Sequence, residues 1–104
     1  VVQIPLHLGT LPGAPSRADL TDALAAFYGT GGFVALLPVD APQGRIDAEA
    51  MNVTNRMRLQ VCGNDDKRQA VLVAVLDNLG KGASGAAVQN LNLMLGVDPA
   101  TGLA

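Results

Sequence analysis

The chain has 104 residues, a formal net charge of −2, 49% hydrophobic residues and one cysteine. This length suits about one small domain, and the low charge with high apolar content argues against intrinsic disorder. The slightly negative net charge argues against nucleic acid as the main partner. A single cysteine allows no internal disulfide framework, which fits a reducing cytoplasm. No apolar run reaches the ~20 residues that a membrane span needs.

Residues 1–8 predict a β-strand, because apolar and other residues alternate along them. One face carries only apolar side chains: Val2, Ile4, Leu6 and Leu8. Pro5 cannot donate a ladder hydrogen bond, which favours an edge strand or a bulge. The chain begins inside this strand without an initiator Met or a signal peptide, so we expect a piece of a longer protein.

A helix is predicted from Ser16 to about Tyr28. Ser16 is a good N-cap, and Asp19 places an acid near the positive end of the helix. Glycines at 29, 31 and 32 end the helix. Its expected buried stripe consists of Leu20, Leu24, Phe27 and Tyr28.

Three further strands are predicted. Residues 33–39 are apolar on both faces and should be covered on both. Residues 40–55 are irregular, with one helical turn at about 47–51. Residues 55–62 and 69–76 predict a β-hairpin with a loop of four to six residues. We expect three side chains of the first hairpin strand to point inward and three outward, respectively Met57, Leu59, Val61 and Arg56, Arg58, Gln60.

The last predicted helix is bare at its start and bulky at its end. The glycines at 82 and 85 and the small residues between and after them open it. Val88, Leu91 and Leu95 recur at helical spacing, with Met94 beside them, so the bulky end should pack into a core. The element order β-α-β-β-β-α predicts an α+β fold with a mixed, largely antiparallel sheet.

Residues 80–85, GKGASG, match the pattern G-x-G-x-x-G of dinucleotide-binding turns. That fingerprint belongs to a βαβ unit with an acidic residue at the end of its second strand. Here Asp98 follows a helix and not a strand. Two other interpretations stay open, namely glycines that let the helix pack tightly and a helix N-terminus that touches a cofactor.

Other candidate groups favour structural roles. Cys62 lies at a strand end with no local base or helix N-terminus to activate it, so a structural thiol is expected and no catalytic residue is assigned. His7, the only histidine, should be exposed or hydrogen-bonded, and no metal-ligand spacing is present. Four basic residues on the hairpin indicate a solvated face, or alternatively a phosphate or partner patch: Arg56, Arg58, Lys67 and Arg68.

The run DNLGKGASGAAVQNLNLMLGV at 77–97, with the following DPATGL, resembles the C-terminus of N-acetyl-gamma-glutamyl-phosphate reductases. VQIPLHL at 2–8, TNR at 54–56 and the hairpin are similar to the shorter bacterial type of that family. The segment DNLGKGA is more distantly similar to aspartate-semialdehyde dehydrogenases. The resemblance covers essentially the whole chain.

The resemblance implies a cytoplasmic, homo-oligomeric, NADP-dependent oxidoreductase of arginine biosynthesis, which converts N-acetylglutamyl phosphate to N-acetylglutamate semialdehyde. Residues 1–77 would then belong to the substrate and dimerisation domain, and residues 78–104 to a cofactor-proximal helix and tail that returns to the Rossmann domain. Matching positions imply five cofactor-proximal residues: Lys81, Gly82, Ala83, Ser84 and Asn90.

The family's glycine-rich phosphate loop, catalytic cysteine and histidine base have no counterpart in these residues. The chain alone is therefore expected to be inactive. A non-catalytic binding or assembly module of the same fold, and a related aspartate-semialdehyde dehydrogenase, remain as alternatives.

Overall fold

The computed structural model describes residues 1–104 and contains four strands, two α-helices and two shorter helical turns. In chain order these are β1 (Val2–His7), a 3₁₀ turn (Leu8–Thr10), α1 (Arg17–Tyr28), β2 (Val34–Leu36), β3 (Met57–Asn64), β4 (Gln69–Leu76), a π-helical turn (Gly80–Ser84) and α2 (Gly85–Leu95).

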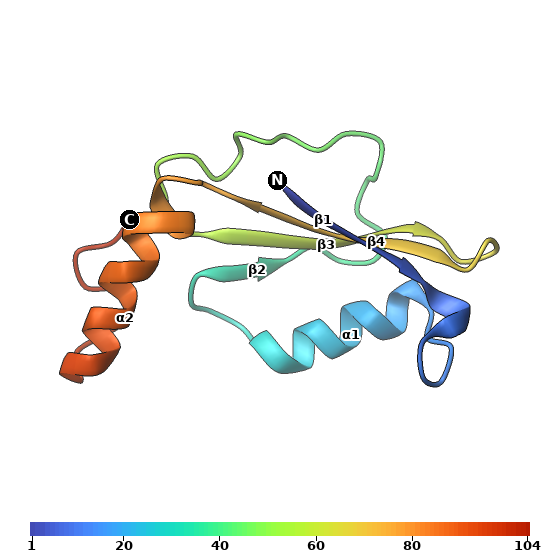
Figure 1. Ribbon diagram of the computed structural model, residues 1–104, viewed down its shortest axis with the longest axis horizontal. Helices are drawn as coiled ribbons and strands as arrows, with labels where there is room; N and C mark the ends of the chain where they lie inside the picture. Colours follow the sequence, from blue (N-terminus) through green and yellow to red (C-terminus); the bar gives the residue numbers. More distant parts are fainter.

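The strands form one sheet in the order β1-β4-β3-β2 (Figure 1). β4 pairs antiparallel with both β1 and β3, whereas β2 pairs parallel with β3. The fold is therefore α+β with a mixed, largely antiparallel sheet, as the element order predicts. β1 is an edge strand, which explains how Pro5 is accommodated in it.

The hairpin of β3 and β4 is confirmed, with a connection at 65–68 between the two strands. Asn64 Oδ1 stabilises the turn by accepting hydrogen bonds from the amides of Asp66 and Lys67, and Arg68 adopts a left-handed backbone with φ of 56°. β2 is only three residues long, shorter than predicted. Residues 47–52 form hydrogen-bonded turns and not a helix.

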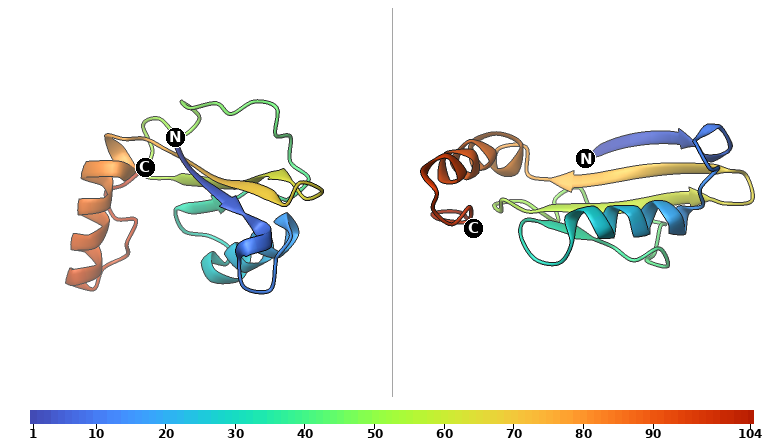
Figure 2. Two further views of the ribbon diagram at one scale, coloured as in Figure 1. Left: turned by 45° about the vertical axis from the view of Figure 1, so that its right-hand side comes forward. Right: turned by 90° about the horizontal axis from the view of Figure 1, so that it is seen from below.

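The core lies between the sheet and α1, which covers one face of it (Figures 1 and 2). Leu8, Val61 and Ala70 are almost fully buried there, and four half-buried residues pack against them: Leu11, Leu20, Leu24 and Leu72. The predicted stripe of α1 is correct in its first half and wrong in its second. Phe27 is 81% exposed and Tyr28 is 38% exposed, because α1 diverges from the sheet toward its C-terminal end (Figure 1).

Two contacts anchor the start of α1. Ser16 and Asp19 form a capping box, in which the Ser16 hydroxyl accepts from the Asp19 amide and the Asp19 carboxylate accepts from the Ser16 amide. The Arg17 guanidinium donates to the carbonyl oxygens of Val39 and Val61, at 2.9 and 3.2 Å. Arg17 therefore ties the helix to β3 and to the loop after β2.

The long connection from β2 to β3 crosses the opposite face of the sheet (Figure 1). Val73 and Val75 of β4 are buried beneath it, each 3% exposed. Gln60 of β3 is also buried, and its Nε2 donates to the Pro42 carbonyl at 3.0 Å. The expectation that Gln60 points outward to solvent is therefore wrong, because the connection supplies a cover that strand periodicity does not reveal.

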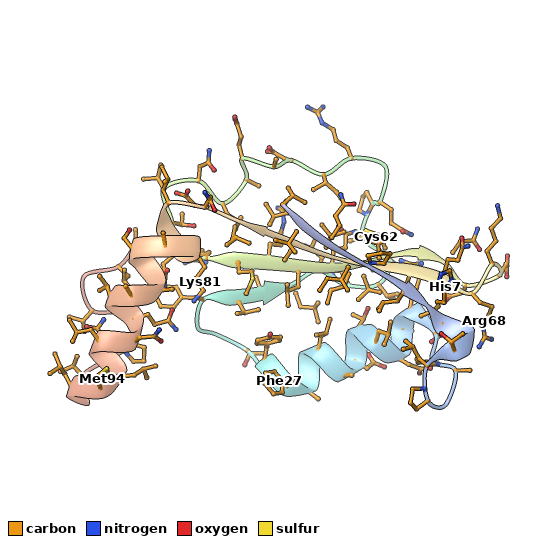
Figure 3. The ribbon with its side chains drawn as sticks, viewed as in Figure 1. His7, Phe27, Cys62, Arg68, Lys81 and Met94 are labelled. Carbon is orange, nitrogen blue, oxygen red and sulfur yellow. The ribbon has the colours of Figure 1, made fainter.

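α2 stands beside one end of the sheet and not on either face (Figures 1 and 2). Its predicted apolar stripe is not packed into a core: Val88, Leu91 and Leu95 are 38%, 52% and 66% exposed. Met94 points away from the body at the far end of the helix and is 83% exposed (Figure 3). Periodicity identifies the apolar face of α2 correctly, but within these residues nothing covers it.

Candidate functional site

The glycine-rich segment at 80–85 forms a π-helical turn before the α-helix begins. The amides of Gly82, Ser84 and Gly85 donate to the carbonyls of the residues five positions earlier, Asp77, Leu79 and Gly80. The Ser84 hydroxyl also donates to the Leu79 carbonyl, at 2.8 Å. The sequence places an ordinary helix start here, whereas the chain makes a wider turn of a kind that is rare and often found at functional sites.

This turn limits how a ligand could bind at the helix start. Anion binding at a helix N-terminus depends on amides that have no main-chain partner. At Gly82, Ser84 and Gly85 those amides are already engaged. A ligand at these positions would therefore meet small side chains, Cα atoms and carbonyl oxygens. The dinucleotide fingerprint also lacks its βαβ setting, because β4 is antiparallel to both neighbours.

Asp77 joins the turn to the segment before β3. Its carboxylate accepts from the amides of Leu79 and Val53, at 3.0 and 2.8 Å. The backbone hydrogen bonds from Leu79, Val53 and Gly80 lower the pKa of this carboxyl, and partial burial opposes them. Val53 has a φ of 61°, which is unusual for a β-branched residue. Asp77 therefore holds a strained backbone position in place.

The three glycines of the segment have different surroundings. A Cβ at Gly80 would lie 2.7 Å from the Thr54 carbonyl oxygen, and a Cβ at buried Gly85 would collide with Asn55 Oδ1. A Cβ at exposed Gly82 would lie 3.3 Å from its nearest neighbours. Gly80 and Gly85 are thus required for packing, whereas Gly82 is required much less.

A network of side chains lies between this turn, α2 and the start of β3. Gln89 Oε1 accepts two hydrogen bonds, from Lys81 Nζ at 2.6 Å and from Asn55 Nδ2 at 3.0 Å. The Lys81 ammonium also lies 5.6 Å from the centre of the Phe33 ring. Lys81 is directed back toward the end of the sheet (Figure 3). The Lys81 ammonium therefore contacts two neutral groups, the Gln89 carboxamide and the Phe33 ring.

Asn55 is 3% exposed, and its Oδ1 has no hydrogen-bond partner. Leaving a buried acceptor unpaired costs about 1–3 kcal/mol. The backbone N–H of Asn55 donates to the Ala104 carbonyl at 2.9 Å, so this residue also contacts the tail that follows α2. Most buried polar atoms in proteins are paired, so this exception indicates that another contact of Asn55 fixes the orientation of its side chain.

A second buried asparagine fastens the tail to α2. Asn92 is 6% exposed, and its Nδ2 donates to the carbonyls of Pro99 and Thr101, at 3.0 and 2.9 Å. The sequence does not single out Asn55, Gln89 or Asn92, because amides carry no charge and follow no ligand spacing. Asn90, which the resemblance places near the cofactor, is exposed, and its side chain makes no hydrogen bond within this chain.

Two open pockets border the Asn55–Gln89–Lys81 network. One, of about 430 Å³, lies between the segment 53–55, the π-helical turn and the tail, and its lining includes Asp77 and Ser84. The other, of about 500 Å³, lies between Phe33, Gln89 and the tail, with Arg56 and Asp98 at its wall. These pockets could accept part of a ligand: Asn55 lines the first, Gln89 lines the second, and Leu103 and Ala104 line both.

The remaining candidate groups show no catalytic arrangement. Burial raises the pKa of the Cys62 thiol, opposed by the Arg17 charge, so Cys62 is not an activated nucleophile. His7 is exposed at the end of β1 (Figure 3). The basic residues do not form one cluster, since Arg56 precedes β3 whereas Lys67 and Arg68 follow it.

No group of three or more His, Cys, Asp or Glu side chains is arranged to hold a metal ion. None of the helices has both the length and the apolar character that crossing a bilayer requires.

No protein-family model matches the chain. Curated relatives do. The chain is 49% identical over 108 residues to N-acetyl-gamma-glutamyl-phosphate reductase 2 of Nostoc sp., and 47% identical over 108 residues to the N-acetyl-gamma-glutamyl-phosphate reductase of Trichormus variabilis. Each match covers 99% of this chain and 34% of the relative. The enzyme of the same name from Brucella ovis is 49% identical over 98 residues, which are 92% of this chain and 32% of the relative.

The chain thus spans about a third of the length of the curated relatives it matches. The identity is high and extends from end to end of the chain, so the resemblance expected from the run at 77–97 is confirmed. The chain corresponds to a C-terminal portion of the N-acetyl-gamma-glutamyl-phosphate reductases.

Proposed function

We propose that this chain is the C-terminal part of an NADP-dependent reductase that converts N-acetylglutamyl phosphate to N-acetylglutamate semialdehyde in arginine biosynthesis. The single observation that carries the proposal is 47–49% identity, over 92–99% of the chain, to proteins named for that reaction. We also propose a cytoplasmic location, because the one cysteine is free and half-buried.

Residues 1–77 would belong to the substrate and dimerisation domain, and residues 78–104 would contact the Rossmann domain. The protruding α2 supports this division, because its apolar face is exposed on residues such as Leu91, Met94 and Leu95. An apolar surface of this kind is typical of a contact with another domain or chain. The unmatched two thirds of the relatives' length would supply that contact.

The part of the α1 face of the sheet that α1 leaves uncovered supports the proposed homo-oligomer. Val2 and Ile4 on β1 are 52% and 48% exposed. Beside them lies an apolar groove of about 190 Å³, lined only by hydrophobic residues: Leu6, Leu20, Ala23, Leu24, Val61 and Leu72. A second copy of the full-length protein would cover this surface.

The residues near the π-helical turn fit one edge of a phosphate-bearing cofactor. The hydrogen-bond donors of these residues support this fit. The Lys81 ammonium contacts only neutral groups, so its charge suits a phosphate. Gly82, Ala83 and Ser84 are exposed and small, and would let a flat ring approach closely. Asn90 is exposed on α2 and could donate from its amide. NADPH would supply the hydride, and residues outside this chain would supply the nucleophile.

The proposal is tested with the full-length protein, by following NADPH oxidation with N-acetylglutamyl phosphate and, in parallel, with aspartyl phosphate. Turnover of the first substrate and not of the second is expected. Preference for aspartyl phosphate would reassign the chain to the semialdehyde dehydrogenases. Absence of both activities in a folded protein that retains its oligomeric state would favour a non-catalytic assembly module instead.

A further inference from the structure

We propose that Gln89 is a positioning residue: oriented by Asn55, its carboxamide oxygen holds the Lys81 ammonium in place to bind a phosphate group. This inference rests on the proposed function, because it assigns a task to Lys81 within the same cofactor-proximal region. Three side chains from three separate segments carry it, one before β3, one in the π-helical turn and one in α2.

The orientation of Gln89 is fixed by what it accepts. A carboxamide oxygen has two lone pairs, and Gln89 Oε1 uses both, one for Lys81 Nζ and one for Asn55 Nδ2. Rotating the Gln89 amide by half a turn would present its NH₂ group to two donors. The only consistent arrangement therefore points the oxygen at Lys81.

The same requirement explains the unpaired oxygen of Asn55. Asn55 must turn its NH₂ group toward Gln89, which leaves Oδ1 facing Gly85 without a hydrogen-bond partner. Rotating Asn55 would place two acceptor oxygens against each other. The chain thus keeps a buried acceptor unsatisfied in order to keep Gln89 oriented, and Gln89 in turn orients Lys81.

The ammonium that this network holds has no acidic side chain as a partner. Gln89 is neutral, and the Phe33 ring attracts the ammonium without neutralising it. A carboxylate at position 89 could accept the same two hydrogen bonds, but it would form an ion pair with Lys81 and offset its charge. A neutral acceptor positions the cation and leaves it able to bind an anion. The anion we assign is a phosphate group, supplied by NADPH or by the acyl phosphate substrate.

The experiment measures binding to the full-length protein of three probes: NADPH, NADH and inorganic phosphate. Lys81→Met removes the charge, Gln89→Met removes the acceptor at similar volume, and Gln89→Glu keeps an acceptor but cancels the charge. All three variants should weaken binding of a phosphate probe about tenfold. Weaker binding of NADPH but not of NADH would identify the ribose phosphate of NADPH as the group that Lys81 binds. Weaker binding of inorganic phosphate would identify the phosphate of the substrate instead.

Asn92→Leu is the matched control, because it removes buried amide hydrogen bonds from the same helix outside the network. It should lower the melting temperature and leave all three affinities unchanged. Unchanged affinities in Gln89→Glu and Gln89→Met, beside a loss in Lys81→Met, would overturn the positioning role and leave the proposed function intact. Unchanged affinities in Lys81→Met would overturn the assignment of Lys81 as a phosphate ligand and its assignment as a cofactor-proximal residue. A wild-type protein that binds phosphate through Lys81 and Gln89 but does not bind NADPH would refute the proposed function alone.

Discussion

Replacing Gly85 by alanine should destabilise the protein even though alanine suits a helix better than glycine. Gly85 has helical dihedral angles of −63° and −44°, so its backbone accepts any L-residue. Ala alone would contribute about 0.5–1 kcal/mol. The added Cβ, however, would collide with Asn55 Oδ1 and lie 2.7 Å from the Gly80 carbonyl oxygen. Overpacking of this kind costs about 1–3 kcal/mol.

Because three contacts of the added Cβ would be closer than 3.0 Å, the upper part of the overpacking range applies, about 2–3 kcal/mol, and the net effect is a loss of about 1–2.5 kcal/mol. For a protein of the relatives' size, about 320 residues, this lowers the melting temperature by about 1.5–4 °C. Thermal unfolding of the full-length variant, followed by fluorescence and by calorimetry, measures the shift. Gly82→Ala is the matched control in the same segment, since its Cβ would meet its nearest neighbours at 3.3 Å, and it should melt within about 1 °C of the wild type.

A double-mutant cycle tests the cause of that loss. In the background of Gly85→Ala, the change Asn55→Ala should cost less than it does in the wild type, because it removes one of the colliding atoms. Gly85→Ala melting at or above the wild-type temperature would refute the reasoning. So would a Gly82→Ala variant that loses as much stability as Gly85→Ala.

Three further outcomes are expected in the full-length protein. Cys62→Ser should keep kcat within about threefold, because a half-buried thiol with a raised pKa serves packing; a loss of several orders of magnitude with the fold intact would contradict this. Ser16→Ala should cost about 1 kcal/mol in urea unfolding, through loss of the capping box, and an unchanged midpoint would count against it. The Asp77 pKa is lowered by hydrogen bonds, so its stabilising contribution is present above about pH 4, the ordinary carboxyl pKa, and is lost as the pH falls through its lower value in the folded protein. The protection factor of the Val53 amide, which is the intrinsic exchange rate divided by the measured one, should therefore fall only in acid, and Asp77→Asn should remove that dependence.

The strands, the hairpin and the capped helix were predictable because each rests on local information. Alternation defines β1 and β3, a continuous apolar run defines β4, and Ser16 with Asp19 marks the start of α1. The burial of Gln60 and the exposure of Phe27 were not predictable, because they depend on which segment covers which face. Periodicity gives the apolar side of an element but not its partner.

The candidate site shows the same limit. Glycine spacing marks the segment at 80–85 but does not distinguish a π-helical turn from an α-helix, since that depends on five-residue hydrogen bonds accepted by Asp77 and Leu79. The Asn55–Gln89–Lys81 network joins residues up to 34 positions apart in the chain. Such a contact leaves no periodic signal in one sequence.

The arrangement of β4 between β1 and β3 has a consequence for aggregation during folding. β4 carries the run AVLVAVL at 70–76, which has no charge, no proline and strong β-propensity. Its pairing with β3 is local and forms within about 1–10 μs, as hairpins do. Its other edge waits for β1, which lies more than sixty positions away in the chain, as the pair Leu6 and Ala70 illustrates.

Until β1 docks, that edge offers unpaired backbone groups to any other strand, including β4 of another molecule. The charges of Lys67 and Arg68 at one end of β4 and of Asp77 at the other flank the run and oppose such stacking. The sheet order that buries the most apolar strand in the finished fold therefore also makes it the segment most exposed to self-association beforehand, and refolding should be most efficient at low protein concentration.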